Sequence, residues 1–352
     1  MNIQDYETEN ARLFVRLKQL NEEDVPDESI FDLVKSYEEL RASYRESVKG
    51  TFKYDDDGFL LKTGHALTNC TVKLLSLPSV KAFNELKNNS SESKRCIVFF
   101  ATRGGLCNRL RAIVSLKIIA RFLGIPFYFI WLENPSCQGG ISNLCSVESH
   151  INVIDFVNMI KSQSYDIYAE SAPDAEWLFY DKYRTIANLG SWSDFKELYS
   201  KEARKFLDEL ISNQGLAGFL EEFVQKKQLG DFLGVHIRRT DFVKYYKQTY
   251  PDKALPSIED YKDKIYKERS SDKFFISTDE VGVIDELDVY FGDSLCFVNV
   301  GEFNTKNLRQ TSFKHSLLDL SVLSRAKKLI ITPGSSFSSY AASVANMEII
   351  EF

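Results

Sequence analysis

The stretch Val235-His236-Ile237-Arg238-Arg239-Thr240-Asp241 places two adjacent arginines directly after an apolar run. Residues 232–235 have the composition of a short buried strand, so the charged residues fall where that strand ends. Ligands of open α/β sheets bind outside the carboxyl ends of the strands. Two planar, permanently charged guanidinium groups at such a position suit a diphosphate. The alternative is a solvated basic turn, which an isolated pair of arginines usually is.

A second predicted strand, residues 95–101, leads into a glycine turn and a long helix. The turn contains Gly104 and Gly105, and apolar residues at helical spacing run from about Asn108 to Phe122. Glycine lets the backbone approach a ligand closely, and amides at a helix start can face an anion. A plain tight connection is the alternative. The pattern is neither the dinucleotide glycine fingerprint nor a phosphate loop, which speaks against a Rossmann dehydrogenase and against a P-loop enzyme.

Two further predicted strands also end in polar residues. The strand at 328–332 is followed by a Pro-Gly turn and then by four serines within residues 335–339, at the start of an alanine-rich helix. One serine is enough to cap a helix, so this density indicates a loop that grips a phosphate. The strand at 274–278 ends at Asp279. This carboxylate is either a helix N-cap or an acceptor for hydrogen bonds from a nucleobase.

Together these four strand ends resemble the fucosyltransferase superfamily, which includes α1,6-, α1,2- and protein O-fucosyltransferases. The resemblance covers roughly residues 95–352 and is carried by the arginine motif at 236–241, the glycine turn, the Ser-Thr-Asp strand end and the serine loop. It implies that Arg239 holds the β-phosphate of GDP-fucose and acts as the main catalytic group. It also implies that His236 and Arg238 line the nucleotide pocket and that Asp279 faces guanine.

The resemblance extends to two loops that would contact the donor from opposite sides. The glycine turn would approach from the other domain, and the serine loop would close over the diphosphate. The residues concerned are Gly104, Gly105, Asn108 and Arg109 in the first loop, and Ser335, Ser336, Phe337 and Ser338 in the second. No cofactor is implied, because GDP-fucose is the donor substrate, and arginines on the diphosphate make a metal ion unnecessary.

One departure from the family pattern leaves the catalytic base open. In the α1,6 enzymes a lysine directly follows the arginine motif, and a glutamate four residues later is the proposed base. Phe242 and Tyr246 stand at these positions here, so neither role transfers. Asp241 is one candidate, either as the base or as a group that orients the arginines. A carboxylate elsewhere in the chain is another candidate, and some relatives have no obvious base, so the sequence leaves the base unassigned.

The pattern of elements predicts an α/β protein of the GT-B type, with two facing Rossmann-like domains and an N-terminal helical extension. Residues 1–92 form the extension, with a hairpin at 51–61 and helices, interrupted at Pro26, that either pack on the body or mediate self-association. Residues 93–225 form an N-terminal α/β domain on the acceptor side. Residues 226–352 form the C-terminal domain that binds the nucleotide sugar.

Composition narrows the function classes. A net charge of -6 without a basic tail argues against nucleic-acid binding, and the six cysteines lack zinc-type spacing. No apolar run reaches the roughly 20 residues that span a bilayer, so we expect no membrane span and a cytoplasmic protein. The Asp55-Asp56-Asp57 run has oxygen ligands that suit Mg²⁺ or Mn²⁺, but the Asp-Gly step that follows favours a solvated hairpin turn.

The sequence therefore predicts an inverting, metal-independent fucosyltransferase that moves L-fucose from GDP-β-L-fucose to a hydroxyl of a glycan or glycoconjugate. Two alternatives stay open. The first is transfer from another nucleotide sugar, because the arginine motif specifies a diphosphate better than it specifies fucose. The second is a noncatalytic nucleotide-sugar binder or assembly subunit, which the missing glutamate allows.

Overall fold

The computed structural model divides the chain into two compact units, Met1–Gly190 and Ser191–Phe352, which are described separately. The described residues are 3–22, 32–33, 35–37, 39–40, 43, 66, 69, 74–76, 80–82, 94–102, 104–132, 147–170, 192–240, 242–269, 272–298 and 313–352. Among these, no helix combines the length and apolarity needed to cross a membrane.

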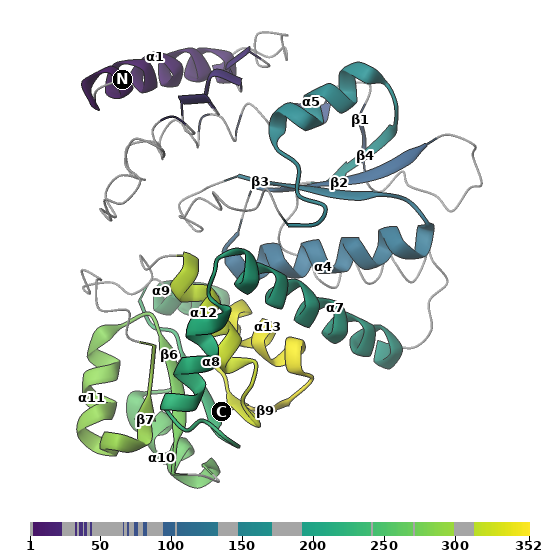
Figure 1. The fold of residues 1–352 in the computed structure, drawn as a ribbon. Coiled ribbons are helices and arrows are strands. Elements are labelled where there is room, and N and C mark those ends of the chain that lie inside the picture. Colours follow the sequence, from purple (N-terminus) through teal and green to yellow (C-terminus); the bar gives the residue numbers. More distant parts are fainter. Residues whose placement is uncertain are drawn as a thin grey trace. The chain divides into compact units, whose positions relative to one another are not determined.

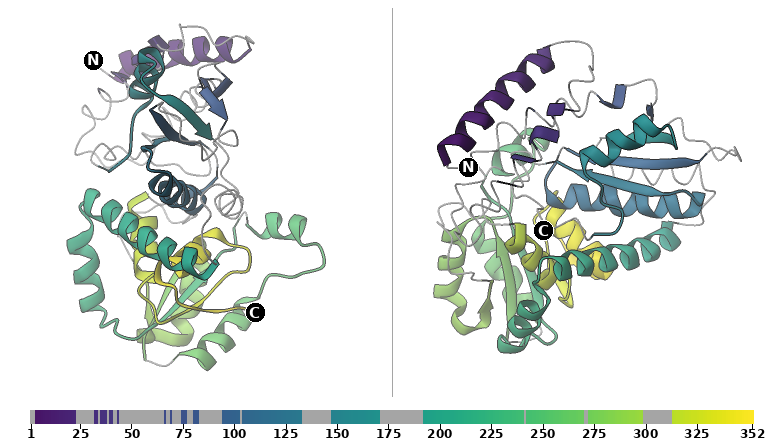
Figure 2. Two further views of the ribbon diagram at one scale, coloured as in Figure 1. Left: turned by 90° about the vertical axis from the view of Figure 1, so that its right-hand side faces the viewer. Right: turned by 45° about the horizontal axis from the view of Figure 1, so that its top comes forward.

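The first unit contains a parallel four-stranded sheet with helices on both faces. Its strand order is β1-β4-β2-β3. The strands are β1 (Val80–Ala82), β2 (Arg95–Ala101), β3 (Phe127–Trp131) and β4 (Asp166–Glu170), and a short 3-10 turn, η1 (Leu74–Ser76), precedes them. Helix α4 (Leu106–Leu123) covers one face and α5 (Val153–Ser162) the other (Figures 1 and 2). Strand β2 is apolar throughout its centre because both of its faces are covered.

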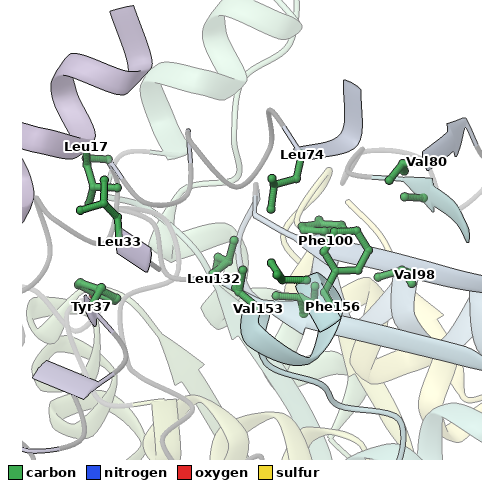
Figure 3. Close-up of a cluster of buried hydrophobic side chains, with 14 of the residues drawn as sticks. Leu17, Leu33, Tyr37, Leu74, Val80, Val98, Phe100, Leu132, Val153 and Phe156 are labelled. Atoms are coloured by element: carbon green, nitrogen blue, oxygen red, sulfur yellow. The ribbon is translucent and has the colours of Figure 1, made fainter. Parts of the chain in front are cut away.

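The N-terminal helix α1 (Ile3–Glu22) packs on this unit. Leu17 of α1 and the helical residues Leu33 and Tyr37 are buried in one hydrophobic cluster with Phe100 of β2 and Phe156 of α5 (Figure 3). The rings of Phe100 and Phe156 meet edge to face with centroids 4.9 Å apart. The predicted N-terminal helix is therefore confirmed, and it contributes to the core. The predicted hairpin at 51–61 lies outside the described residues.

The second unit contains a parallel five-stranded sheet in the order β7-β6-β5-β8-β9. The strands are β5 (Leu233–Ile237), β6 (Phe274–Thr278), β7 (Leu295–Cys296), β8 (Lys328–Ile330) and β9 (Glu348–Ile350). The helices are α7 (Trp192–Asn213), α8 (Ala217–Lys226), α9 (Phe242–Thr249), α10 (Ile258–Glu268), α11 (Val281–Phe291), α12 (Phe313–Leu323) and α13 (Ser336–Ala345), with a 3-10 turn η4 (Gly292–Ser294). The predicted α/β class with two Rossmann-like parallel sheets is confirmed.

The order of these strands locates a topological switch point. From the central strand β5 the chain continues outward through β6 and β7, then returns to β8 on the other side of β5 and continues to β9. Loops after β5 and β8 leave in opposite directions at such a point, and ligands of open α/β sheets bind there. The arginine motif follows β5 and the serine loop follows β8, so both predicted loops lie at this position.

The division at 190/191 differs from the predicted boundary at 225/226. Helices α7 and α8 account for the difference, because α7 packs on α12 and α13 and α8 packs on α12. The amphipathic sequences of α7 and α8 predict that each helix has a buried face, but they do not predict which sheet that face covers.

The side chains of Leu329 and Ala326 pack closely against Gly234 of β5, so a larger residue at this position should destabilise the fold. A Cβ at this position would lie 2.9 Å from Leu329 Cδ1 and 3.0 Å from Ala326 Cβ. We expect Gly234→Ala to lower the free energy of unfolding by about 1–3 kcal/mol, the usual cost of overpacking a core. The control is Gly218→Ala in α8, where nothing lies within 4 Å of the added methyl group. Urea unfolding measures both variants, and equal stability of the two would contradict the packing described for β5.

Candidate functional site

Thr332 fastens the start of the arginine turn to the neighbouring strand. Its Oγ1 donates to the backbone oxygen of His236 at 2.8 Å and accepts from the backbone N–H of Arg238 at 2.9 Å. The hydroxyl of Tyr261 lies 3.0 Å from the same oxygen. Because a threonine hydroxyl has one hydrogen, which goes to His236, Tyr261 must donate. The buried side chain of Thr332 thus links the segment that follows β8 to β5 and to α10.

Asp279 fastens the second half of the turn. Its Oδ1 accepts from the backbone N–H of Arg239 at 2.8 Å, and its Oδ2 accepts from Thr240 Oγ1 at 2.5 Å. The helix N-cap considered from sequence is not formed by Asp279, because the N-cap of α11 is Glu280, without a side-chain bond. Its carboxylate instead ties the end of β6 to the arginine turn. Contact with guanine stays a prediction.

The side chain of Arg239 keeps most of its donors for a ligand. Its Nη1 donates to the backbone oxygen of the buried Pro256 at 2.9 Å. Within the described residues, its Nε and Nη2 have no partner, and the residue is half-buried. The guanidinium of Arg238 lies over the ring of Phe242 with its Cζ 4.9 Å from the centroid. An anchored backbone and an open guanidinium are what a preorganised anion site requires.

The serine loop presents the N-terminus of α13. Gly334 adopts a left-handed conformation (φ 76°), and Ser335 is the N-cap without a side-chain capping bond. Ser338 and Ser339 instead donate to the backbone oxygen of Ser335 at 3.4 and 2.9 Å. Ser338 is buried, whereas Ser336 and Phe337 are half-buried. The first amides of α13 are thus not capped by a side chain, and such amides bind anions.

Two buried polar atoms at this site have no hydrogen-bond partner among the described residues. They are Nδ1 of His236 and Oγ of Ser335, in side chains that are 5% and 1% exposed. His236 stacks on Phe337 with centroids 5.1 Å apart. Burial, and next the charge of Arg238, lowers the pKa of His236 to about 3, so the imidazole is neutral near pH 7. A buried polar atom without a partner costs about 1–3 kcal/mol, which a ligand with matching groups would recover.

A buried carboxylate adjoins the site and was missed by sequence reasoning. Asp319 of α12 accepts from Ser277 Oγ at 2.7 Å, and Nε2 of His315 lies 3.6 Å from its other oxygen. Burial raises its pKa, while His315 and Ser277 act in the opposite direction. Ser277 pairs with His236 in the sheet register, which brings Asp319 close to the arginine strand. The available signal was a histidine and an aspartate four residues apart in a mostly buried helix.

In the first unit, the buried side chain of Arg109 forms a hydrogen bond with the glycine turn. Gly104 has φ 72° and Gly105 is the N-cap of α4. The fully buried Arg109 donates from Nε to the oxygen of Gly104 at 3.2 Å and from Nη1 to the oxygen of Leu132 at 2.5 Å. Its guanidinium also lies over Trp131, with Cζ 4.8 Å from the ring centroid. These contacts give Arg109 a structural role that the sequence did not suggest.

The structure thus gathers most of the predicted site residues around one sheet edge. The members are His236, Arg238, Arg239, Asp279, Ser335, Ser336, Phe337 and Ser338. Gly104, Gly105, Asn108 and Arg109 belong to the first unit, and Asn108 is half-buried on the first turn of α4. Their approach to a bound donor stays a prediction. Asp241 and the Asp55-Asp56-Asp57 run lie outside the described residues.

Solved structures similar to this chain include fucosyltransferases. The NodZ α1,6-fucosyltransferase co-crystallised with GDP matches 74% of this chain and 95% of its own, with 16% identity and a TM-score of 0.39. The NodZ structure from Bradyrhizobium has the same coverage and identity and a TM-score of 0.40. POFUT1 in complex with GDP matches 75% of this chain and 99% of its own, with 12% identity and a TM-score of 0.44.

No protein-family model matches this sequence, and no curated protein matches it. TM-scores below 0.5 at such low identity do not by themselves carry a function over to this chain. The residues at the sheet edge, and the motif they form, carry the proposal that follows.

The hydrogen bonds of the Thr332 hydroxyl can be tested by their effect on stability. Thr332→Val keeps the shape of the side chain but leaves the N–H of Arg238, the oxygen of His236 and the hydroxyl of Tyr261 without their shared partner. We expect a loss of at least about 2 kcal/mol in the free energy of unfolding. The control, Thr332→Ser, keeps the hydroxyl. If both variants unfold at the same urea concentration, the bonds do not hold the site together.

The buried imidazole predicts a pH dependence of stability. In the unfolded chain the pKa of His236 is about 6.5, so between that value and its folded value of about 3 only the unfolded state binds the proton. Stability therefore falls on acidification below pH 6.5, by about 1.4 kcal/mol for each pH unit through this group. Between pH 7.5 and pH 5 we expect the wild type to lose about 2 kcal/mol more than His236→Gln does. Equal losses in urea unfolding would mean that His236 is not held neutral by burial.

Proposed function

We propose that this chain is a glycosyltransferase that moves L-fucose from GDP-β-L-fucose to an acceptor hydroxyl, with inversion at the anomeric carbon and without a metal ion. The observation that carries the proposal is Arg239. Its backbone N–H donates to Asp279, and its guanidinium lies at the switch point of a parallel sheet. Among the described residues only Nη1 of this guanidinium has a hydrogen-bond partner. The choice of fucose rests on the resemblance of the 236–241 motif to the fucosyltransferase superfamily.

The chemistry explains why this arrangement suits glycosyl transfer. When the bond between the sugar and the diphosphate breaks, negative charge builds on the leaving β-phosphate while the sugar becomes oxocarbenium-like. Donors fixed in advance stabilise that charge without having to reorganise, and losing one of them commonly costs about 3–4 kcal/mol. Arg239 and the uncapped amides of α13 supply such donors, and this positive potential takes the part that a divalent ion plays in metal-dependent enzymes.

His236 and Ser335 supply groups for the nucleotide itself. A neutral imidazole adds no charge beside Arg238, and its Nδ1 can pair with a polar edge or hydroxyl of the ligand. The Oγ of Ser335 can donate to a phosphate oxygen at the start of α13. The catalytic base is proposed to be Asp241, and an unchanged pH–rate profile in Asp241→Asn would remove it from that role.

Replacement of Arg239 tests the catalytic proposal. We expect Arg239→Ala to reduce the turnover number at least about a hundredfold while the free energy of unfolding stays near that of the wild type. The matched control is Arg269→Ala, which removes an arginine from the same unit at the end of α10, where its guanidinium lies over Tyr266 and Phe291. A folded Arg239→Ala protein with a near-normal turnover number would contradict the proposal.

The donor is tested separately by calorimetric titration in the presence of EDTA. We expect GDP-fucose to bind more tightly than GDP-mannose or UDP-sugars, and EDTA to leave its affinity unchanged. Preference for another nucleotide sugar would keep the diphosphate site and reassign the sugar. Binding that appears only with a divalent ion would contradict the role given to Arg239.

A further inference from the structure

Helix α9, which directly follows the arginine turn, and Tyr250 directly after it carry a row of four aromatic rings. The ring centroids of Tyr245 and Phe242 are 5.6 Å apart, those of Phe242 and Tyr246 6.0 Å, and those of Tyr246 and Tyr250 4.9 Å. The two inner rings are buried at 4% exposure, whereas Tyr245 and Tyr250 at the ends are 54% and 40% exposed. The inner rings are part of the packed interior, whereas the outer rings keep much of their surface exposed to solvent.

The row adjoins both loops of the candidate donor site. Phe242 lies under the guanidinium of Arg238, with Cζ 4.9 Å from its ring centroid. A Cβ on Gly334, at the turn before α13, would lie 3.7 Å from both Phe242 and Tyr250. Because the same Cβ would lie 3.9 Å from Tyr246, the row runs beside the turn that precedes α13. A second substrate that reacts with the donor has to bind next to the donor site.

The exposed side of α9 is also basic. Lys244 and Lys247 flank Tyr245 and Tyr246 in the sequence of the helix. Lys253 follows the helix, with its Nζ 5.8 Å from the ring centroid of Tyr250. All three lysines are exposed, and none forms an ion pair within the described part of the chain. Helix α9 contains no acidic residue, and Asp252 is the nearest one after it in the sequence, although the whole chain has a net charge of -6. A positive patch on an acidic protein favours an anionic partner.

We propose that Tyr245, Tyr250 and the three lysines form an acceptor subsite that takes an acidic glycan. This inference rests on the proposed function, and it names the class of acceptor for that same site. Tyrosine rings offer an apolar face to the C–H groups of a pyranose and keep a hydroxyl for its polar edge. The lysines then select sugars that carry a carboxylate or a sulfate. We assign Tyr245 and Tyr250 to the acceptor and not to guanine because the exposed lysines beside them favour an anionic group, whereas a guanine base carries no charge.

The experiment uses a glycan array that contains neutral oligosaccharides and their sialylated, uronic-acid and sulfated counterparts. The full chain is applied with GDP present, so that the donor site is filled. We expect binding to acidic glycans and not to their neutral counterparts. Tyr245→Ala/Tyr250→Ala should weaken this binding at least about tenfold. The corresponding double change to phenylalanine should retain most of it, because the rings still stack.

Two further variants separate charge from stacking. Lys244→Gln/Lys247→Gln should remove the preference for acidic over neutral glycans. The matched control is Tyr266→Ala, which removes a tyrosine that is 66% exposed on α10, away from the aromatic row in sequence, and should change nothing.

Each variant is also titrated with GDP, and this separates the possible failures. A wild type that does not bind GDP contradicts the proposed function. If GDP affinity falls in the tyrosine double variant, the row belongs to the donor site and the acceptor assignment is overturned. It is equally overturned if no glycan binds, if neutral glycans bind as well as acidic ones, or if the alanine substitutions leave glycan binding unchanged while GDP still binds.

Discussion

The geometry of the candidate site depends on the hydrogen bonds that close the arginine turn against its two neighbouring strands. Thr332, after β8, holds the backbone at His236 and Arg238, and Asp279, after β6, holds the backbone at Arg239. Because β5 lies between these strands, the turn is secured from both sides at the carboxyl edge of the sheet. Backbone fastening leaves the side chain of Arg239 available for a ligand. A guanidinium held in this way can stabilise charge that develops elsewhere without first having to be ordered.

The same edge carries polar groups that the fold leaves without partners. Nδ1 of His236 and Oγ of Ser335 are buried and unpaired within the described residues, and the N-terminus of α13 has no side-chain cap. Native structures rarely keep such groups unless another demand outweighs their cost. Here these groups lie in or next to the loops that follow β5 and β8. The proposed ligand would pair with them, which explains why the fold tolerates the free-energy cost of leaving them unpaired. We propose that the exposed rings at the ends of the aromatic row, Tyr245 and Tyr250, extend this site toward a second substrate.

Much of this arrangement could be predicted from local sequence. Strand β5 and the strand ends at Asp279 and Thr332 are short apolar runs followed by polar residues, and parallel pairing brings such ends to one edge. The serine-rich start of α13 was also located from sequence, although Ser336, Ser338 and Ser339 lie within the helix, and its contact with a phosphate stays a prediction. These predictions succeeded where strand periodicity and turn chemistry act over a few neighbouring residues.

Other features depend on contacts between distant residues. The resemblance places Arg109 in a loop that contacts the donor, and the structure shows that its side chain is fully buried and donates to the oxygens of Gly104 and Leu132. Asp279 looks like a helix cap, and only the sheet order shows that it reaches the arginine turn. Asp319 lies in a mostly buried helix, and its partner Ser277 is 42 residues away. No periodicity encodes such pairings, because they arise from the way helices and strands pack.

Backbone hydrogen exchange with and without GDP, in the presence of EDTA, tests the central claim most directly. If the diphosphate is held by the arginine turn and the N-terminus of α13, GDP should slow exchange at residues 236–240 and 335–339, and EDTA should not change this protection. The amides of α8, which are not assigned to the ligand, provide an internal reference. Protection that appears elsewhere in the second unit, or only when a divalent ion is added, would contradict the account.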